Sequence, residues 1–545
     1  MEISSFGLMA IQTIGVVIAC LVTGRSLFHF FQLESYQFPG YFRTIRRQGI
    51  RVWAPGILLS VLMLAGGILL QPSIKLSNTR NTLCCILLSV WSILGGLLIH
   101  RALSRQTAKK KMVFTPRMKR LYFVSFIVFA ALLILCLSLS QSLFSSHKVL
   151  ALGIESLFPS LLPIWVSISG LLAWPLEKAI SEMYFRDAQR ILKERPDLIR
   201  IGITGSWGKT SVKFVLGTLL GEKYPVLVTP ASFNTPMGVT KVIRTMLEPG
   251  HRVFVAEMGA RHVGDIRELC RLVHPEIGIL TSVGPQHLDT FHTQERITKT
   301  KYELMEAIPE DGACFFSDDD GIVFDLWKKT KKNKYLTGLD SKKDDTWAED
   351  ISISSQGSSF VLCHGDERIA CETELLGELN IRNIVLCADV CFYLGLTGRE
   401  ISRGIRKLKP VEHRLQLKRG SGGITVLDDA FNSNIRGAKQ AFEVLKEFPC
   451  KRIIVTPGMV ELGEQEEKLN QEFGQAMAGC CDIAILVGKK RSEAITQGLD
   501  LSGFPSENII VVSSLQEAEE KLKEITVSGD TILFENDLPD NYNEE

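Results

Sequence analysis

The chain has 545 residues, of which 46% are hydrophobic, with a formal net charge of +2 and a mean hydropathy of +0.14. Its length suggests three or four domains of about 150 residues each, and the near-balanced charge argues against a nucleic-acid-binding protein. The cysteines form no C-x-x-C pair, which argues against a structural zinc site, and free thiols fit a reducing compartment.

The first third of the chain is strongly apolar, which explains the positive mean hydropathy. Stretches that approach the roughly 20 residues needed to cross a bilayer core are 5–24, 53–71, 82–99, 121–141 and 149–174. The first lacks the basic start and the small-residue cleavage site of a signal peptide, so we expect a retained anchor. Few polar residues line these stretches, which gives a transport pore little support.

Basic residues between these stretches predict their orientation. Arg and Lys gather in the connections 25–52 and 100–120, whereas 72–81 and 142–148 carry only Lys75, Arg80 and Lys148. Because basic loops stay on the cytoplasmic side, five spans place the N-terminus outside and everything after Pro175 in the cytoplasm. We therefore expect a multi-pass cell-membrane protein in contact with the lipid bilayer, with cytoplasmic catalytic domains.

The segment Ile201–Leu220 has the layout of a phosphate-binding loop. An apolar run ends at the sequence T-G-S-W-G-K-T-S, residues 204–211, and a helical apolar pattern follows. Glycines admit phosphate oxygens to the backbone, the helix start favours an anion, and the lysine and threonine can reach phosphates and Mg²⁺. The alternative is an ordinary strand–turn–helix with a chance Gly-Lys-Thr. We expect phosphate binding by Gly205, Gly208, Lys209, Thr210 and Ser211.

Further strand-like runs follow the loop and end in polar side chains. The run 252–260 ends near Glu257, the run 277–289 ends near His287, and a helical pattern with Lys299 and Lys301 comes next. Strands that alternate with helices predict a parallel sheet, whose carboxyl edge binds ligands. Each of these residues alone would more often be structural or solvated, but their joint order favours one site.

Nine segments together resemble the Mur ligase family, the ATP-dependent amide ligases of peptidoglycan assembly, and most closely its D-Ala-D-Ala-adding branch. These segments are TGSWGKTS (204–211), SFNTPMGV (232–239), EMGARHVGDI (257–266), SVGPQHLDTF (282–291), ITKTKYEL (297–304), GELNIRN (377–383), HRLQ (413–416), DDAFNSN (428–434) and GMVELGE (458–464). The resemblance implies an α/β fold, with a P-loop Mur-ligase central domain with a parallel sheet at 176–412 and a Rossmann-like C-terminal domain at 413–545. The apolar stretches predict a helical membrane domain at 1–175 before them.

The resemblance also implies ATP and two Mg²⁺ ions as cofactors, with catalytic roles for Lys209, Glu257, His287 and Lys301. Lys209 would bind the β- and γ-phosphates, Thr210 and Glu257 would hold one Mg²⁺, and His287 with Lys301 would help hold the second. The family lysine at the position of Lys301 is carbamylated by CO₂. The remaining nucleotide contacts that the resemblance implies are Asn234 near the γ-phosphate, Asn380 and Asn383 at adenine, and Arg414 and Asp429 closing over the nucleotide.

The implied reaction activates a substrate carboxylate as an acyl phosphate, which an incoming amine then attacks. The expected partners are a muramoyl peptide or another acyl substrate, an amino acid or dipeptide acceptor, and cell-wall synthesis proteins. The family's usual N-terminal domain, which grips the UDP of its substrate, has no counterpart here. Two alternatives therefore stay open: an amide ligase for another polymer, similar to the poly-γ-glutamate synthases, and a membrane transport ATPase.

Overall fold

The structure is a computed structural model that describes residues 5–34, 36–70, 78–103, 112–143, 156–231, 233–318, 321–339, 344–430, 435–460 and 462–536. The chain divides into two compact units, residues 1–182 and 183–545, and each is described by itself. The predicted domain boundaries at 175 and 412 stay predictions.

The first unit is helical, and its longest helices are apolar, as the composition predicts. They are α1 (Ser5–Thr23), α2 (Arg25–Leu33), α3 (Phe38–Gln48), α4 (Ala54–Leu70), α5 (Asn78–Leu103), α6 (Pro116–Leu143) and the first part of α8 (Leu162–Lys193). Within the described residues, three helices are long and apolar enough to cross a membrane, and two bent helix pairs raise the number to as many as five. Length and composition thus permit the predicted spans, and insertion stays a prediction.

Helix α8 differs from the sequence interpretation. The helical spacing of Ile180, Met183, Tyr184, Ala188 and Ile191 predicts an amphipathic helix, separate from the apolar stretch that ends at residue 174. One continuous helix, Leu162–Lys193, carries both, with Pro175 inside it. A proline inside a helix removes one backbone hydrogen bond and bends the helix without necessarily ending it. The apolar and amphipathic parts are therefore one rod, whose last turns belong to the second unit.

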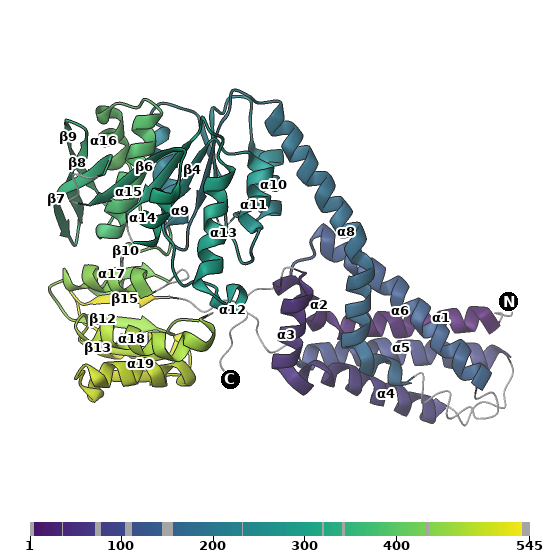
Figure 1. The fold of residues 1–545 in the computed structure, drawn as a ribbon. Helices are drawn as coiled ribbons and strands as arrows, with labels where there is room; N and C mark the ends of the chain where they lie inside the picture. The colour runs from purple at the N-terminus through teal and green to yellow at the C-terminus, as the bar shows by residue number, and fades with distance from the viewer. Residues whose placement is uncertain are drawn as a thin grey trace. The chain divides into compact units, whose positions relative to one another are not determined.

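The second unit begins with a large sheet flanked by helices (Figure 1). In the described residues the strand order is β2-β3-β1-β4-β5-β6-β7-β8-β9, with parallel pairing up to β7 and antiparallel pairing beyond it. The strands are β1 (Ile199–Thr204), β2 (Val226–Val228), β3 (Val253–Glu257), β4 (Ile277–Leu280), β5 (Ala313–Ser317), β6 (Asn333–Leu339), β7 (Thr346–Ser354), β8 (Gly357–His364) and β9 (Glu367–Thr373).

Helices cover both faces of this sheet, because its central strands are apolar on both sides. Along β3, Val253 and Val255 face one core, and Phe254 and Ala256 face the other. The helices that supply the two cores are α9 (Lys209–Leu220), α10 (Pro236–Met246), α11 (Asp265–Val273), α13 (Gln294–Ala307), α14 (Ile322–Lys329), α15 (Glu378–Tyr393) and α16 (Gly398–Arg406), with the short α12 (Leu288–Phe291) at the site. The predicted parallel α/β sheet is confirmed.

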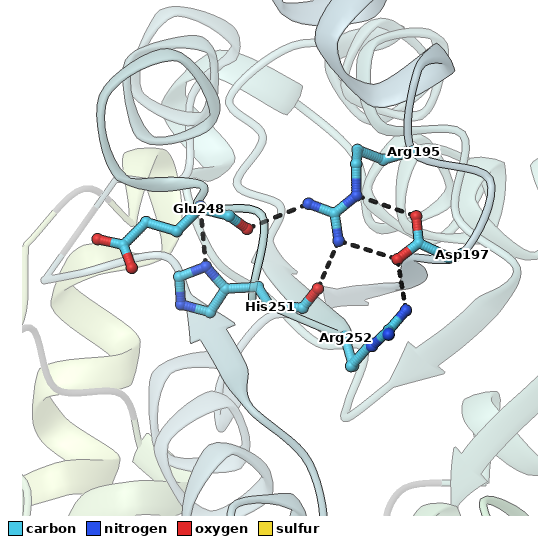
Figure 2. A network of polar contacts seen from close by, with 5 residues as sticks. All are labelled: Arg195, Asp197, Glu248, His251 and Arg252. Carbon is cyan, nitrogen blue, oxygen red and sulfur yellow. Dashed lines mark hydrogen bonds and ion pairs between the residues drawn. The ribbon is translucent and has the colours of Figure 1, made fainter.

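A polar network fastens the end of α8 to the amino ends of β1 and β3 (Figure 2). The Arg195 guanidinium donates to both Asp197 carboxylate oxygens at 2.9 and 3.0 Å, to the Glu248 carbonyl at 3.1 Å and to the His251 carbonyl at 2.6 Å. Arg252 pairs with the same Asp197 at 2.8 Å. These contacts lie at the sheet edge opposite the carboxyl ends of the strands, so their role is structural.

Replacing Arg195 with alanine is expected to destabilise the second unit by about 1–3 kcal/mol, because four hydrogen bonds are lost and two carbonyls lose a partner. Thermal unfolding of the full chain in detergent would measure the change. Arg190→Ala is the matched control, since the Arg190 side chain is 64% exposed and pairs only on the helix surface. Equal midpoints for the two variants would contradict this role.

Strands β5 to β9 extend the sheet beyond what the sequence analysis predicted. Where they meet α15, Asp389 is buried and its Oδ1 accepts a hydrogen bond from the Thr346 hydroxyl at 2.7 Å. His364 Nδ1 lies 2.7 Å from the same hydroxyl. Burial raises the pKa of Asp389 to about 7, and the charges of Asp345 and Asp344 add to the rise.

Asp389 should make the stability of the second unit fall as pH rises from about 4 to about 7. Because the folded-state pKa of about 7 lies above the unfolded value of about 3.9, the folded chain binds more protons than the unfolded chain in this window. The free energy of unfolding therefore falls as pH rises through the window, and the loss is complete above it. In Asp389→Asn, the loss of unfolding free energy between pH 5 and pH 8 should be about 2–3 kcal/mol smaller than in wild type. Denaturant titrations at both pH values measure it, with the exposed Asp366→Asn as control. Parallel pH profiles for wild type and Asp389→Asn would refute the prediction.

A second sheet with its own helices follows, as predicted for the C-terminal third. Its strand order in the described residues is β10-β11-β15-β12-β13-β14, parallel except for β10. The elements are β10 (Gln416–Arg419), β11 (Thr425–Asp429), α17 (Ile435–Lys446), β12 (Arg452–Thr456), α18 (Glu466–Ala478), β13 (Ile483–Val487), α19 (Lys489–Leu501), β14 (Ile509–Val512), α20 (Leu515–Ile525) and β15 (Thr531–Glu535). A doubly wound sheet of this kind is Rossmann-like.

Candidate nucleotide-binding and ligase site

The loop between β1 and α9 has a backbone that two glycines make possible. Gly205 has φ +155°, and a Cβ there would lie 2.1 Å from the Thr281 hydroxyl oxygen; Gly208 has φ +82° at the start of α9. The neighbouring strand fixes the loop, since the Ser206 hydroxyl donates to the Gly284 carbonyl at 2.9 Å. The loop thus presents the amino end of α9, which suits an anion.

Lys209 lies inside this loop. Its Nζ donates to the carbonyls of Gly205 and Ser206 at 2.6 and 3.1 Å. Burial among these groups lowers the pKa of Lys209 to about 8, against the opposing charge of Glu257. A polyphosphate would favour the charged form of this lysine, as expected of a phosphate-binding loop.

Glu257, at the carboxyl end of β3, is where the predicted site residues converge. Its Oε1 accepts from the Thr210 hydroxyl at 3.2 Å and from Asn234 Nδ2 at 3.0 Å, and its Oε2 accepts from Lys213 Nζ at 2.9 Å. Burial acts to raise the pKa of Glu257, but the charges of Lys213 and Lys209 outweigh it, so the pKa lies below its ordinary value. The carboxylate is therefore ionised.

Thr210 and Glu257 fit one Mg²⁺ ion. Their oxygens lie 3.2 Å apart, and adjacent ligands of an octahedral ion are about 3 Å apart at Mg–O distances of 2.0–2.1 Å. Among the described residues, no three His, Cys, Asp or Glu side chains gather into a metal-binding group. One carboxylate and one hydroxyl match the habit of Mg²⁺ of taking few protein ligands together with phosphates.

Lys301 and His287 lie near this cluster in different settings. Lys301 on α13 is 2% exposed; burial lowers its pKa well below 10.5, and the charge of Lys209 lowers it further. A neutral amine is the form that reacts with CO₂, so the environment suits the predicted carbamate. His287 is the N-cap residue of α12 and has φ +53°.

The two predicted adenine residues have different surroundings. Asn380 on α15 donates to the Leu376 carbonyl at 2.8 Å and lines a small pocket with Phe214, Leu375 and Arg414. Ser211 also lines this pocket. Asn383 is buried one turn later, and its Oδ1 would lie 3.2 Å from a Cβ on Gly208. Asn380 thus faces a pocket, and Asn383 supports the phosphate loop.

The segment before β10 links the site to the C-terminal sheet. An Arg414 guanidinium nitrogen lies 3.4 Å from the Thr210 hydroxyl. Asp429 Oδ1 accepts from the Leu415 amide at 2.9 Å, and burial raises the pKa of Asp429 to about 6 against the charge of Arg414. His413 and Leu415 have φ of +58° and +47°. Arg414 therefore reaches the loop, and Asp429 holds the strained connection.

Two buried residues of the second unit were given no role by the sequence analysis. Lys213 had no assigned role, although its position four residues after Lys209 places both on one face of α9. Glu303 is buried and accepts from the Gly264 and Arg267 amides at 3.1 and 3.0 Å, at the start of α11. The helical spacing from Lys209 is the one sequence signal that points to Lys213, and no local sequence pattern points to Glu303.

Comparison with known proteins agrees with this geometry. The family profile described as Mur ligase middle domain matches residues 203–391. The profile described as Mur ligase, glutamate ligase domain, matches residues 413–535. Together they cover every predicted site residue and both sheets except the first residues of β1, and neither covers the helical unit.

Individual relatives come from the same family. The UDP-N-acetylmuramoyl-tripeptide–D-alanyl-D-alanine ligases of Bacillus subtilis (strain 168) and Escherichia coli (strain K12) are each 27% identical; the matches cover 61% and 66% of this chain and 72% and 81% of theirs. The crystal structure of MurF ligase from Thermotoga maritima in complex with ADP is 25% identical with a TM-score of 0.59, over 65% of this chain and 80% of that one. The chain belongs to the Mur ligase family of ATP-dependent ligases, whose middle and C-terminal domains it carries.

Proposed function

We propose that the chain is a MurF-like ligase, which uses ATP to join D-Ala-D-Ala to the free carboxylate of a muramoyl peptide in peptidoglycan precursor synthesis. The observation that carries this proposal is the convergence of Thr210 and Asn234 on Glu257 beside Lys209. The named activity of the Bacillus subtilis and Escherichia coli relatives supplies the substrates.

The chain's own residues would bind and orient the reactants. The loop amides and Lys209 bind the β- and γ-phosphates, and Asn234 donates toward the γ-phosphate. The substrate carboxylate attacks the γ-phosphorus in line and ADP leaves; the amine then attacks the acyl carbon, phosphate leaves and one proton is released. The positive charges of Lys209 and Arg414 offset the charge that gathers on the transferred group.

Mg²⁺ would be held by Thr210 and Glu257 at one position, and by His287 with carbamylated Lys301 at a second. There it would supply positive charge to the phosphates without proton transfer. Asn380 and its pocket would bind adenine, and Asp429 holds the connection that lets Arg414 reach the loop.

The decisive experiment is a coupled assay on detergent-purified full chain. It contains ATP, Mg²⁺, UDP-MurNAc-tripeptide whose free carboxylate carries ¹⁸O, and D-Ala-D-Ala, with products read by mass spectrometry. A pentapeptide product together with ¹⁸O in the released phosphate supports the proposal, because only an acyl phosphate moves that oxygen. If no product forms with this substrate but product forms with a lipid-linked muramoyl peptide or with polyglutamate, the acyl substrate is not the one proposed. ATP turnover that needs neither carboxylate nor amine would refute a ligase.

We also propose that the helical unit inserts into the cell membrane, with the catalytic domains on the cytoplasmic side. The span-forming helices and the basic connections support this, including Arg46 and Arg47 in the last turn of α3. Cells expressing the chain should retain it in carbonate-washed membranes. The exposed Cys450 should react with a membrane-impermeant maleimide only after lysis. Labelling of Cys450 in intact cells would show that the catalytic domains lie on the outer side of the membrane.

A further inference from the structure

Lys213 is a fully buried lysine next to the candidate metal site. Its side chain has 0% exposure, and its Nζ donates to Glu257 Oε2 at 2.9 Å and to the Ala231 carbonyl at 2.7 Å. A buried ammonium is stable only when it is paired and hydrogen-bonded. Since the phosphate loop already has Lys209, the burial of a second lysine one turn later needs its own explanation.

The two oxygens of Glu257 are divided between different partners. Oε1 faces Thr210 and Asn234, the residues that fit Mg²⁺ and the γ-phosphate. Oε2 faces away from them and is held by Lys213. The carboxylate can therefore offer a cation one oxygen only, and its charge is already offset by an ammonium in direct contact.

Lys213 also holds the segment that brings Asn234 to the site. Its second acceptor, the Ala231 carbonyl, belongs to a residue with φ +42°. Three residues later, the Asn234 carbonyl accepts from the Gly259 amide at 2.8 Å, and its side chain donates to Glu257. One ammonium thus joins α9, β3 and this segment at a single point.

We propose that Lys213 is a positioning residue that prevents Glu257 from binding Mg²⁺ on its own, so that the ion is bound only together with the phosphates of ATP. The ammonium compensates the carboxylate and occupies Oε2, which leaves Oε1 as the one carboxylate oxygen beside the Thr210 hydroxyl. Phosphate oxygens must then supply the missing negative charge and ligands. The proposal rests on the proposed ATP-dependent function, because it assigns Glu257 to the metal.

The test measures metal binding without nucleotide, using Mn²⁺ as the probe and electron paramagnetic resonance to count free ion. Wild type should show no saturable site below millimolar Mn²⁺. Lys213→Met, which keeps the length of the side chain and removes its charge, should gain one site that binds at least tenfold more tightly. The double variant Lys213→Met/Glu257→Gln should lose that site again, which separates it from binding elsewhere on the chain.

A second readout distinguishes positioning from a structural role. Lys213→Arg keeps the charge and should resemble wild type in Mn²⁺ binding, whereas a role in packing alone predicts that arginine and methionine behave alike. Thermal unfolding is followed in parallel, and added Mn²⁺ should raise the midpoint of Lys213→Met but not that of wild type. Lys213→Gln is measured in the same way if the methionine variant does not fold.

A wild type that binds Mn²⁺ as tightly as Lys213→Met would overturn the proposal. So would a gained site that survives Glu257→Gln, or failure of both the methionine and glutamine variants to fold even with Mn²⁺ present. None of these measurements needs an acyl substrate. A wild type without ligase activity is therefore a separate result, which would count against the proposed function alone.

Discussion

Lys209→Met is expected to lower the kcat/KM of ATP-dependent ligation by about 10³-fold or more, because it removes a preorganised positive charge from the transferring phosphate. The Lys209 ammonium lies within the loop on the Gly205 and Ser206 carbonyls, one helical turn from the buried Lys213. Arg414 contacts the loop at a different place, the Thr210 hydroxyl, so it should not replace the Lys209 ammonium.

The same lysine gives a direct measurement of nucleotide binding. With its pKa at about 8, Lys209 is mostly neutral at pH 9. Bound phosphates favour its charged form, so ATP binding at pH 9 should take up close to one proton, and binding at pH 6.5 should take up almost none. Titration calorimetry in two buffers that differ in ionisation enthalpy measures this number.

Lys241→Met is the matched control, because Lys241 is exposed on α10 and its ammonium lies over the Phe233 ring. It should keep both the ligation rate and the proton uptake. Lys209→Met should lose both while its unfolding midpoint stays near that of wild type. Uptake of a proton by the Lys209→Met variant would assign the titration to another group and contradict this account of the loop.

Lys301→Ala is expected to lower ligation by at least about 10²-fold, provided that CO₂ converts the buried amine into a carbamate that helps hold Mg²⁺. The amine is 2% exposed, and burial keeps its pKa well below the usual value. Because the neutral amine is the nucleophile that attacks CO₂, the site favours the modification at neutral pH.

The modification can be observed without any activity measurement. Protein equilibrated with ¹³C-bicarbonate should show one carbamate carbon signal that is absent from Lys301→Ala. Lys299→Ala is the control: Lys299 is exposed two residues away on the same helix, and its removal should leave both the signal and the rate unchanged. Full activity in CO₂-depleted buffer, or a signal that survives Lys301→Ala, would show that the second cation position is built differently.

The sequence by itself determined the parts of this protein that depend on neighbouring residues. The loop 204–211 follows from glycine spacing, because only glycine adopts the backbone angles found at Gly205 and Gly208. The alternation of strands with helices follows from the apolar period. Glu257 was correctly predicted at a strand end, where parallel strands bring their carboxyl ends to one edge. The same prediction was wrong for His287, because β4 ends at Leu280 and His287 is the N-cap residue of α12.

Only the tertiary structure decided the relations between distant residues. Lys213 and Glu257 are 44 positions apart, and their contact depends on how α9 packs on β3. The added strands β5 to β9 and the unbroken helix α8 were likewise not evident, since pairing partners and the continuity of a helix through Pro175 depend on packing from elsewhere in the chain. Local patterns report backbone preference and burial over about one element, whereas the pairing of charges across a sheet depends on topology and register.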